Sequence, residues 1–168
     1  MPKIIENLEG RLTAVARKQI KENGYSAVTV RSVAKECGVG VGTVYNYFPS
    51  KDALLAGYML EDWEKCIGDI QAAGEKSDTP RPVLRCMYDQ LLIFAKKHQS
   101  VFLDEAAASA FAGSFSKYHH ILRSQLAALI HKFCKDDFSA EFIAEALLTW
   151  TMAGKDFDII IGMLDKLF

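Results

Sequence analysis

The chain has 168 residues, of which half are hydrophobic and 24% are charged, and its formal net charge is −1. Frequent aromatic residues exclude intrinsic disorder, and the composition is that of a folded protein of one or two domains. Four separated cysteines without a Cys-x-x-Cys pair, no apolar run of membrane-spanning length and no N-terminal signal predict a cytoplasmic protein, with no membrane partner.

The first third of the chain predicts a helix-turn-helix. Helical periodicity dominates throughout, so we expect an all-α fold without a sheet. Apolar residues at three- and four-residue steps predict a first helix over residues 2–23, ended by Gly24. Thr29 is placed to cap a short helix that ends before Gly38, and a second short helix follows the turn and ends before Pro49. Two short helices joined by a glycine turn form the motif.

The rest of the sequence predicts longer and more apolar helices. Ser50 is placed to cap a connecting helix over residues 51–73, and a Pro-, Gly- and Ser-containing linker follows it. The helices expected after that linker are 82–98, 101–112, 115–135, 139–153 and 155–168. We therefore expect a helix-turn-helix DNA-binding domain over residues 1–50 and a helical regulatory and dimerisation domain over residues 51–168.

Two stretches of the first third are familiar. They read GYSAVTVRSVA from Gly24 and GVGVGTVYNYFPSKDALL from Gly38. With the apolar spacing of the preceding helix, they resemble the N-terminal domain of the TetR family of bacterial transcriptional regulators over about residues 10–56. The resemblance implies an all-α homodimer that binds palindromic double-stranded operator DNA. It also implies a C-terminal domain that senses a small-molecule effector and then releases the DNA, as a repressor does.

The second helix of such a motif lies in the major groove, and flanking hydroxyls and cations contact phosphates. The residues expected to contact DNA are Thr29, Arg31, Gly40, Val41, Gly42, Thr43, Tyr45, Asn46, Tyr47 and Lys51. Base reading is expected from Val41, Thr43 and Asn46, because methyl groups pack against thymine and polar groups bond base edges. Phosphate contacts are expected from Tyr47 and Lys51.

Two of the residues expected to contact DNA have a second interpretation. Arg31 is suited either to a phosphate contact or to an ion pair with Glu36. Tyr45 is suited either to DNA or to the small helical core, and Phe48 is expected in that core.

The turn departs from the family pattern, which commonly reads Gly-Val-Ser-Lys/Arg-Gly-Thr. Gly40 stands in place of the serine and Val41 in place of the cation, so we expect few and relatively apolar DNA contacts. Residues 1–58 nevertheless carry a net charge of +3 and the remainder −4, which hints at a polyanion partner for the first part. Two alternatives follow: a regulator or activator controlled by a protein partner, and a dimeric interaction protein that has lost DNA binding.

The second part of the chain offers a candidate effector pocket and a dimer surface. Effector pockets are mostly apolar, and the candidate lining residues are Tyr88, Leu92, Phe111, Phe115, Tyr118 and His119. The last two helices are apolar on two sides, so a second copy is expected to cover one side. The residues expected at this dimer interface are Phe142, Ala146, Trp150, Phe157, Ile160, Ile161 and Leu164.

Catalytic and metal sites are not expected. His131 and Cys134 share a helix face but make only half of a zinc site, and spacing places no third ligand. The sequence has no nucleophile-elbow, phosphate-loop or His-Glu-x-x-His motif. We therefore expect no cofactor, no metal and no enzymatic activity.

Overall fold

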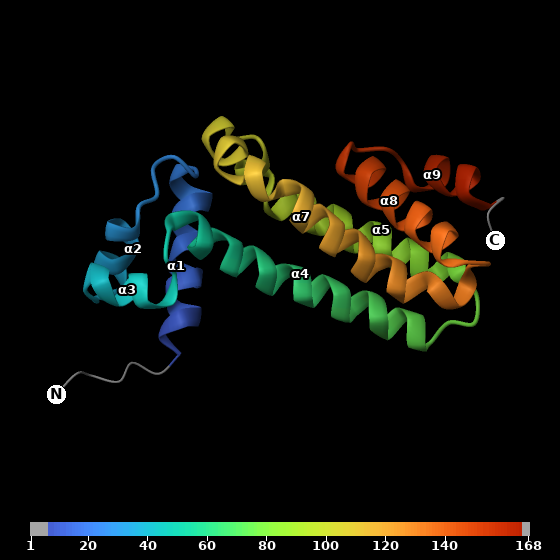
Figure 1. The fold of residues 1–168 in the computed structure, drawn as a ribbon, viewed down its shortest axis with the longest axis horizontal. Helices are drawn as coiled ribbons and strands as arrows, with labels where there is room; N and C mark the ends of the chain where they lie inside the picture. Colours follow the sequence, from blue (N-terminus) through green and yellow to red (C-terminus); the bar gives the residue numbers. More distant parts are fainter. Residues whose placement is uncertain (1–6, 166–168) are drawn as a thin grey trace. The chain divides into compact units, whose positions relative to one another are not determined.

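The computed structural model describes residues 7–165, and the side chains of residues 111–118 lie outside the described part. Over that range the chain is all-helical, as predicted (Figure 1). The helices are α1 (Leu8–Asn23), α2 (Val30–Cys37), α3 (Val41–Tyr47), α4 (Lys51–Glu75), α5 (Pro80–Lys97), α6 (Gln99–Phe102), α7 (Glu105–Ile130), α8 (Asp137–Met152) and α9 (Phe157–Leu164), with a 3₁₀ turn at His131–Phe133. None of the described helices is both long and apolar enough to cross a membrane.

Helix boundaries differ from the prediction mainly in the second part. The expected break at Gly113 is wrong, because α7 continues through it. In place of the expected helix 101–112, the structure has the short α6 and the first turns of α7. A single glycine lowers helix propensity by about 1 kcal/mol, which tertiary packing of a long helix readily outweighs. The last helix is shorter than the expected 155–168, and the expected start of the first helix, residues 2–6, lies outside the described part.

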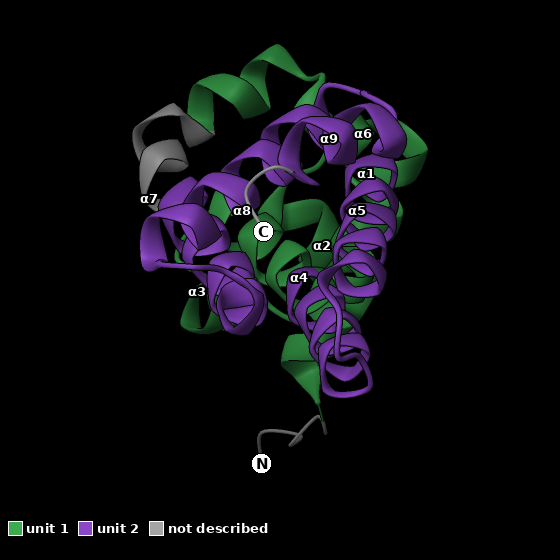
Figure 2. Cartoon of the chain, turned by 90° about the vertical axis from the view of Figure 1, so that its right-hand side faces the viewer, with its two compact units in different colours: residues 1–62, 98–113 green, residues 63–97, 114–168 purple. Residues whose placement is uncertain are grey.

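The chain divides into two compact units (Figure 2). Unit 1 comprises residues 1–62 and 98–113, and unit 2 comprises residues 63–97 and 114–168. Unit 1 thus holds the three N-terminal helices together with the first half of α4, α6 and the start of α7. The division into a DNA-binding domain over residues 1–50 and a regulatory domain over residues 51–168 stays a prediction.

The core of unit 1 holds the N-terminal helices together. α1 packs against α2 and α6, and α2 packs against α3. The apolar stripe of α1 supplies Leu12, Ala16 and Ile20, which are all buried. Phe48 is only 6% exposed, so its expected place in the core is confirmed.

Local signals set the turn between α2 and α3. The backbone N–H of Ser32 donates to Thr29 Oγ1 over 3.0 Å, and the N–H of Thr29 donates to Ser32 Oγ over 3.1 Å. This reciprocal capping box confirms the capping role of Thr29. Gly38 ends α2 in the left-handed conformation with φ of +70°, which glycine adopts without strain.

Gly57 on α4 allows this helix to pack closely on the unit 1 core. A Cβ atom at Gly57 would lie 2.9 Å from Cε1 of the buried Phe48 ring. We expect Gly57→Ala to lower the free energy of unfolding by about 1–2 kcal/mol, because overpacking outweighs the gain in helix propensity. Gly68→Ala on the same helix meets no atom within 4 Å, so we expect it to raise stability by up to about 1 kcal/mol. Urea unfolding of both variants measures the difference, and equal shifts would contradict this packing argument.

In unit 2, α8 packs against both α5 and α9. This packing corrects the expected dimer surface on the last helix. Four of the residues predicted there are buried within the protomer: Phe157, Ile160, Ile161 and Leu164. The outward-facing apolar residues of α9 are instead Ile159, 64% exposed, and Met163, 77% exposed. On α8, Phe142 and Trp150 are exposed as expected, and Ala146 is half-buried.

Candidate nucleic-acid interface

Helix α3 has one inward and one outward side. Val44 and Phe48 are buried, and Val41 is partly buried against the same core. Because α-helical residues are about 100° apart, Gly42 and Asn46 lie on the opposite side, and both are exposed. Val41 is therefore less available for base reading than expected, whereas Asn46 faces outward.

Two tyrosines lie on either side of this outward face. Tyr45 is 51% and Tyr47 is 47% exposed, so Tyr45 does not belong to the core. Thr43, one turn before Tyr47, is half-buried. The predicted residues of α3 therefore form one surface, with an amide at its centre and phenol groups at its flanks.

Among the described residues, packing does not require glycine at the start of α3. A Cβ atom at Gly42 would meet no atom within 4 Å, and one at Gly40 would meet only Thr43 Oγ1 at 3.7 Å. Gly40 caps α3 with φ of −69°, a conformation open to any residue. Glycine inside a helix is less stable than alanine by about 0.5–1 kcal/mol. The surface of α3 is thus bare at the position where another molecule would approach most closely.

Arg31 is exposed in the first turn of α2, where no acidic residue accompanies it. Its expected alternative, an ion pair with Glu36, is contradicted. Glu36 instead accepts from Lys18 Nζ at 2.9 Å and from Gln19 Nε2 at 2.7 Å, which ties α1 to α2. A cation near a helix N-terminus is unfavourable by a few tenths of a kcal/mol, and a nearby phosphate would remove this penalty.

Lys51 is held by the loop before α2. Its Nζ donates to the carbonyl oxygen of Tyr25 over 2.6 Å and lies 3.7 Å from the centroid of the Tyr25 ring. Burial lowers the pKa of Lys51, and the Tyr25 hydroxyl donates to Asp52. The sequence carried no signal for this contact, because the two residues lie 26 positions apart. An ammonium group has three donors, so Lys51 keeps donors for a phosphate but also fixes the loop.

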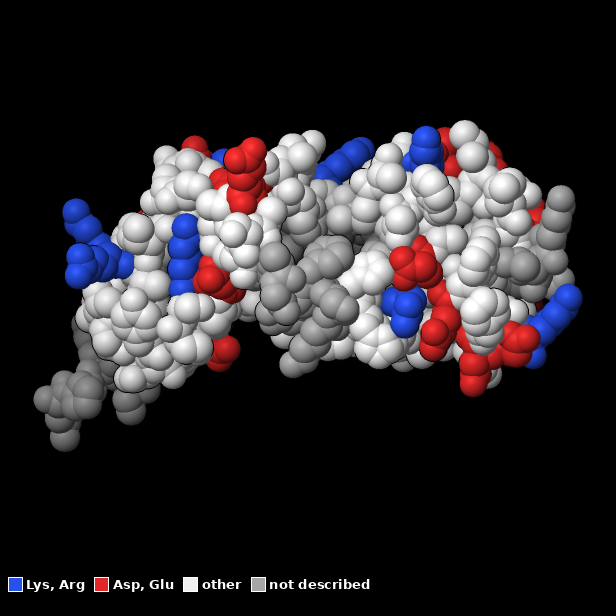
Figure 3. Space-filling model, turned by 45° about the horizontal axis from the view of Figure 1, so that its top comes forward, with Lys and Arg blue, Asp and Glu red and all other residues white. Residues whose placement is uncertain are grey.

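The charge on this surface is sparse. On the face drawn in Figure 3, the surface of unit 1 carries a few separate basic side chains, with acidic side chains beside some of them. α3 itself has no charged residue. Since each neutralised phosphate contributes to the salt dependence of binding, such a surface predicts a shallow dependence of DNA affinity on salt.

Of the residues predicted to line an effector pocket, only some have described side chains. Phe111, Phe115 and Tyr118 lie outside the described side chains. Tyr88 is half-buried and donates to the carbonyl oxygen of Lys155 over 3.1 Å, and Leu92, one turn away, is half-buried. His119 Nε2 lies 3.5 Å from Glu145 Oε1, so the imidazole faces a carboxylate of α8.

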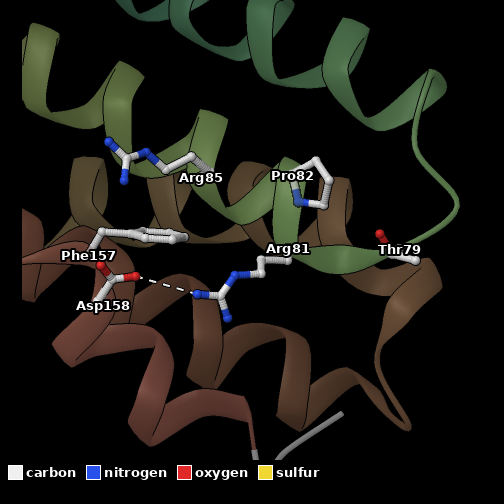
Figure 4. Close-up of a pocket in the computed structure, with 6 residues that line it drawn as sticks. All are labelled: Thr79, Arg81, Pro82, Arg85, Phe157 and Asp158. Atoms are coloured by element: carbon white, nitrogen blue, oxygen red, sulfur yellow. Dashed lines mark hydrogen bonds and ion pairs between the residues drawn. The ribbon is translucent and has the colours of Figure 1, made fainter.

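A shallow hollow on unit 2 lies elsewhere (Figure 4). Its lining residues are Thr79, Arg81, Pro82, Arg85, Phe157 and Asp158. Arg81 Nη2 lies 3.4 Å from Asp158 Oδ1, and Arg81 Nη1 lies 3.5 Å from Asp165 Oδ2. Arg85 Nε lies 3.0 Å from Asp89 Oδ2. Because both guanidinium groups already form ion pairs with carboxylates, the hollow is poorly suited to bind an anion.

His131 and Cys134, which the sequence offered as half of a zinc site, contact other groups of the protein. His131 Nε2 lies 2.6 Å from Asp137 Oδ1, and the Cys134 thiol donates to the carbonyl oxygen of Ile130. Across the described part of the chain, no three His, Cys, Asp or Glu residues are grouped so as to hold a metal ion.

Comparison with known sequences gives a family match that runs from α1 into the start of α4. The model of bacterial regulatory proteins, tetR family, matches residues 12–58. The HTH-type transcriptional repressor KstR of Mycolicibacterium smegmatis is 34% identical over 96 residues, which cover 52% of this chain and 47% of KstR. The uncharacterized HTH-type transcriptional regulator YuxN of Bacillus subtilis is 33% identical over 88 residues, which cover 50% of this chain and 30% of YuxN. The matched part thus spans less than half the length of these relatives.

Solved structures extend the likeness to the whole fold. The TetR family repressor AlkX from Dietzia sp., implicated in biodegradation of n-alkanes, has a TM-score of 0.68 at 15% identity and covers 94% of this chain and 97% of its own. The fatty acid degradation regulator FadR from Bacillus halodurans has a TM-score of 0.59 at 19% identity and covers 98% of this chain and 95% of its own. At these identities the likeness shows the fold alone.

Proposed function

We propose that this chain, which belongs to the TetR family by its helix-turn-helix at residues 12–58, is a repressor that binds palindromic operator DNA as a homodimer. The family is one of regulators, so the chain is not an enzyme. The proposal includes a small apolar effector that releases the DNA. Effector binding and DNA binding would be coupled if the effector favours a dimer whose two α3 helices no longer match the spacing of the operator half-sites.

The observation that carries DNA binding is the outward surface of α3. Gly42 lowers the stability of a seven-residue helix, although a Cβ atom there would meet no atom within 4 Å among the residues that the structure describes. A bare backbone in the first turn is what close approach to a groove floor requires. Tyr45, Tyr47 and Arg31 stand exposed around this surface, where hydroxyl and guanidinium groups reach phosphates.

A gel-shift assay with the DNA upstream of the protein's own gene tests the proposal. We expect a shift that weakens only modestly as salt rises. The missing charge on α3 favours one other function, a dimeric interaction protein that has lost DNA binding. No shift with any fragment at low salt would reject the repressor and leave that alternative.

Gly42→Ala should change stability and DNA affinity in opposite directions. Alanine is the better helix former, and its methyl meets no atom within 4 Å, so we expect a gain of about 0.5–1 kcal/mol in unfolding free energy. The same methyl would hold the helix away from the groove, so we expect DNA affinity to fall by about tenfold, which corresponds to about 1.4 kcal/mol. Thermal unfolding and titration with labelled DNA measure the two effects. Unchanged DNA affinity of Gly42→Ala would show that close approach to DNA does not require glycine at this position.

The dimer surface that we propose consists of Phe142 and Trp150 on α8 and Ile159 and Met163 on α9. All four are large apolar side chains that are exposed in the protomer. Exposed apolar side chains gathered on adjacent helices favour association with a second copy, because closed twofold pairs are the commonest oligomers. A dimer also supplies the second α3 that a palindromic operator needs.

For the effector we propose a long-chain apolar molecule. Two proteins with the same fold are a repressor implicated in n-alkane biodegradation and a regulator of fatty acid degradation. Tyr88 and Leu92 leave half-buried apolar surface on α5 for such a ligand. Palmitic acid and hexadecane are suitable probes, and we expect one of them to raise the melting temperature and release bound DNA. If neither does so at saturation, control by a protein partner becomes the better account.

A further inference from the structure

Among the side chains of α3, that of Asn46 points most directly away from the core. It follows buried Val44 by two positions, which is about 200° around the helix, and precedes buried Phe48 by two. Gly42 lies one turn before Asn46 on the same side and has no side chain. The short amide side chain of Asn46 is therefore the first group that a groove floor would meet.

The chemistry of α3 restricts which base it can read. The commonest specific contact to guanine is made by arginine or lysine, and α3 carries neither. Asparagine instead pairs with adenine, because its amide donates to N7 and accepts from N6 at the same time. Thr43, three residues before Asn46, adds a methyl group and a hydroxyl, which suit the neighbouring thymine.

We propose that Asn46 determines sequence specificity by reading an adenine, so that each operator half-site has an A·T pair at the position facing α3. The inference rests on the proposed DNA binding and deepens it. Tyr45 and Tyr47 lie about 100° to either side of Asn46 and are longer, so they reach the groove walls rather than the same base.

Other residues of the motif do not compete for this role. Val41 is partly buried against the core, and its methyl groups have no hydrogen-bonding capacity. Arg31 belongs to α2, outside the helix that faces the bases, and the ammonium of Lys18 is engaged by Glu36. A guanine contact at the centre of the half-site would therefore lack the arginine or lysine that most often makes it.

Selection from a randomised duplex library tests the proposal, because such a library contains every candidate half-site. We expect the full-length protein to enrich a palindrome with an A·T pair at one central position of each half-site. Asn46→Ala should enrich the same palindrome with that position degenerate. Asn23→Ala is a matched control, because Asn23 is an exposed asparagine at the end of α1, and it should select the original motif. A guanine at the central position, or an unchanged motif with Asn46→Ala, would overturn the inference while leaving DNA binding intact.

A second measurement does not depend on folding of a variant. In the selected duplex, 7-deazaadenine replaces the central adenine and removes the N7 acceptor. We expect the wild-type protein to lose about 5-fold in affinity, since one bond of a bidentate pair that contributes about 1–3 kcal/mol of discrimination is removed. Asn46→Ala should bind the two duplexes equally. Equal binding by the wild type would reject the adenine contact, and enrichment of no DNA at all would reject the proposed function together with it.

Discussion

Replacing Ile159 and Met163 by glutamate is expected to convert the proposed dimer into monomers and to lower affinity for a palindromic operator by at least about 100-fold. Both side chains are apolar, and they are 64% and 77% exposed on α9. Carboxylates at these positions would be desolvated against a second copy and would face their own equivalents across a twofold axis. A loss of about 3 kcal/mol, which corresponds to about 100-fold, follows from separating the two half-site contacts.

Sedimentation velocity and operator titration on the same preparations measure both effects. Ile93→Glu supplies the control, because Ile93 is also an exposed apolar residue of unit 2 but belongs to α5. We expect this control to remain dimeric. Dimers of the α9 double variant, or monomers of the α5 control, would show that the pair forms through another surface.

The N-terminal motif was predictable because its signals are local. Thr29 caps α2, Gly38 takes the left-handed conformation that ends it, and Pro49 follows the end of α3. Each signal acts within a few residues, so it can be read without knowing what the segment packs against. Ser32 was not predicted as a capping residue, although its spacing of three from Thr29 is that of a capping box.

Long-range choices were not predictable in the same way. The last helix has two apolar stripes, and periodicity alone does not tell which stripe its own protomer covers; α8 and α5 cover the one with Phe157. The partner of Glu36 proved to be Lys18, which packing of α1 on α2 brings near. Lys51 similarly binds the Tyr25 loop, a contact that follows from how α4 enters the core.

Asp62 is a residue of unit 1 whose loss should strongly destabilise the fold. Its Oδ1 lies 3.0 Å from Arg17 Nη2 of α1, and its Oδ2 lies 3.0 Å from Nε2 of His98. His98 is only 1% exposed and stacks on Tyr58 with ring centroids 5.3 Å apart. One carboxylate of α4 therefore connects the first helix with the segment that leads into α6 and α7.

Asp62→Ala is expected to lower the unfolding free energy by about 3 kcal/mol, because it removes the carboxylate that pairs with both the buried His98 imidazole and the Arg17 guanidinium group. For a chain of this size the melting temperature should fall by about 10 °C. Glu61→Ala is the matched control: Glu61 is adjacent, lies 3.4 Å from the same Arg17 and is exposed, so its loss should be at most about 1 kcal/mol. The loss of unfolding free energy for Asp62→Asn should lie between those of the two alanine variants, since asparagine keeps the size and one acceptor of aspartate but not its charge. If thermal unfolding ranks Glu61→Ala as equal to Asp62→Ala, burial does not govern the strength of this network, and α4 is joined to α1 by packing alone.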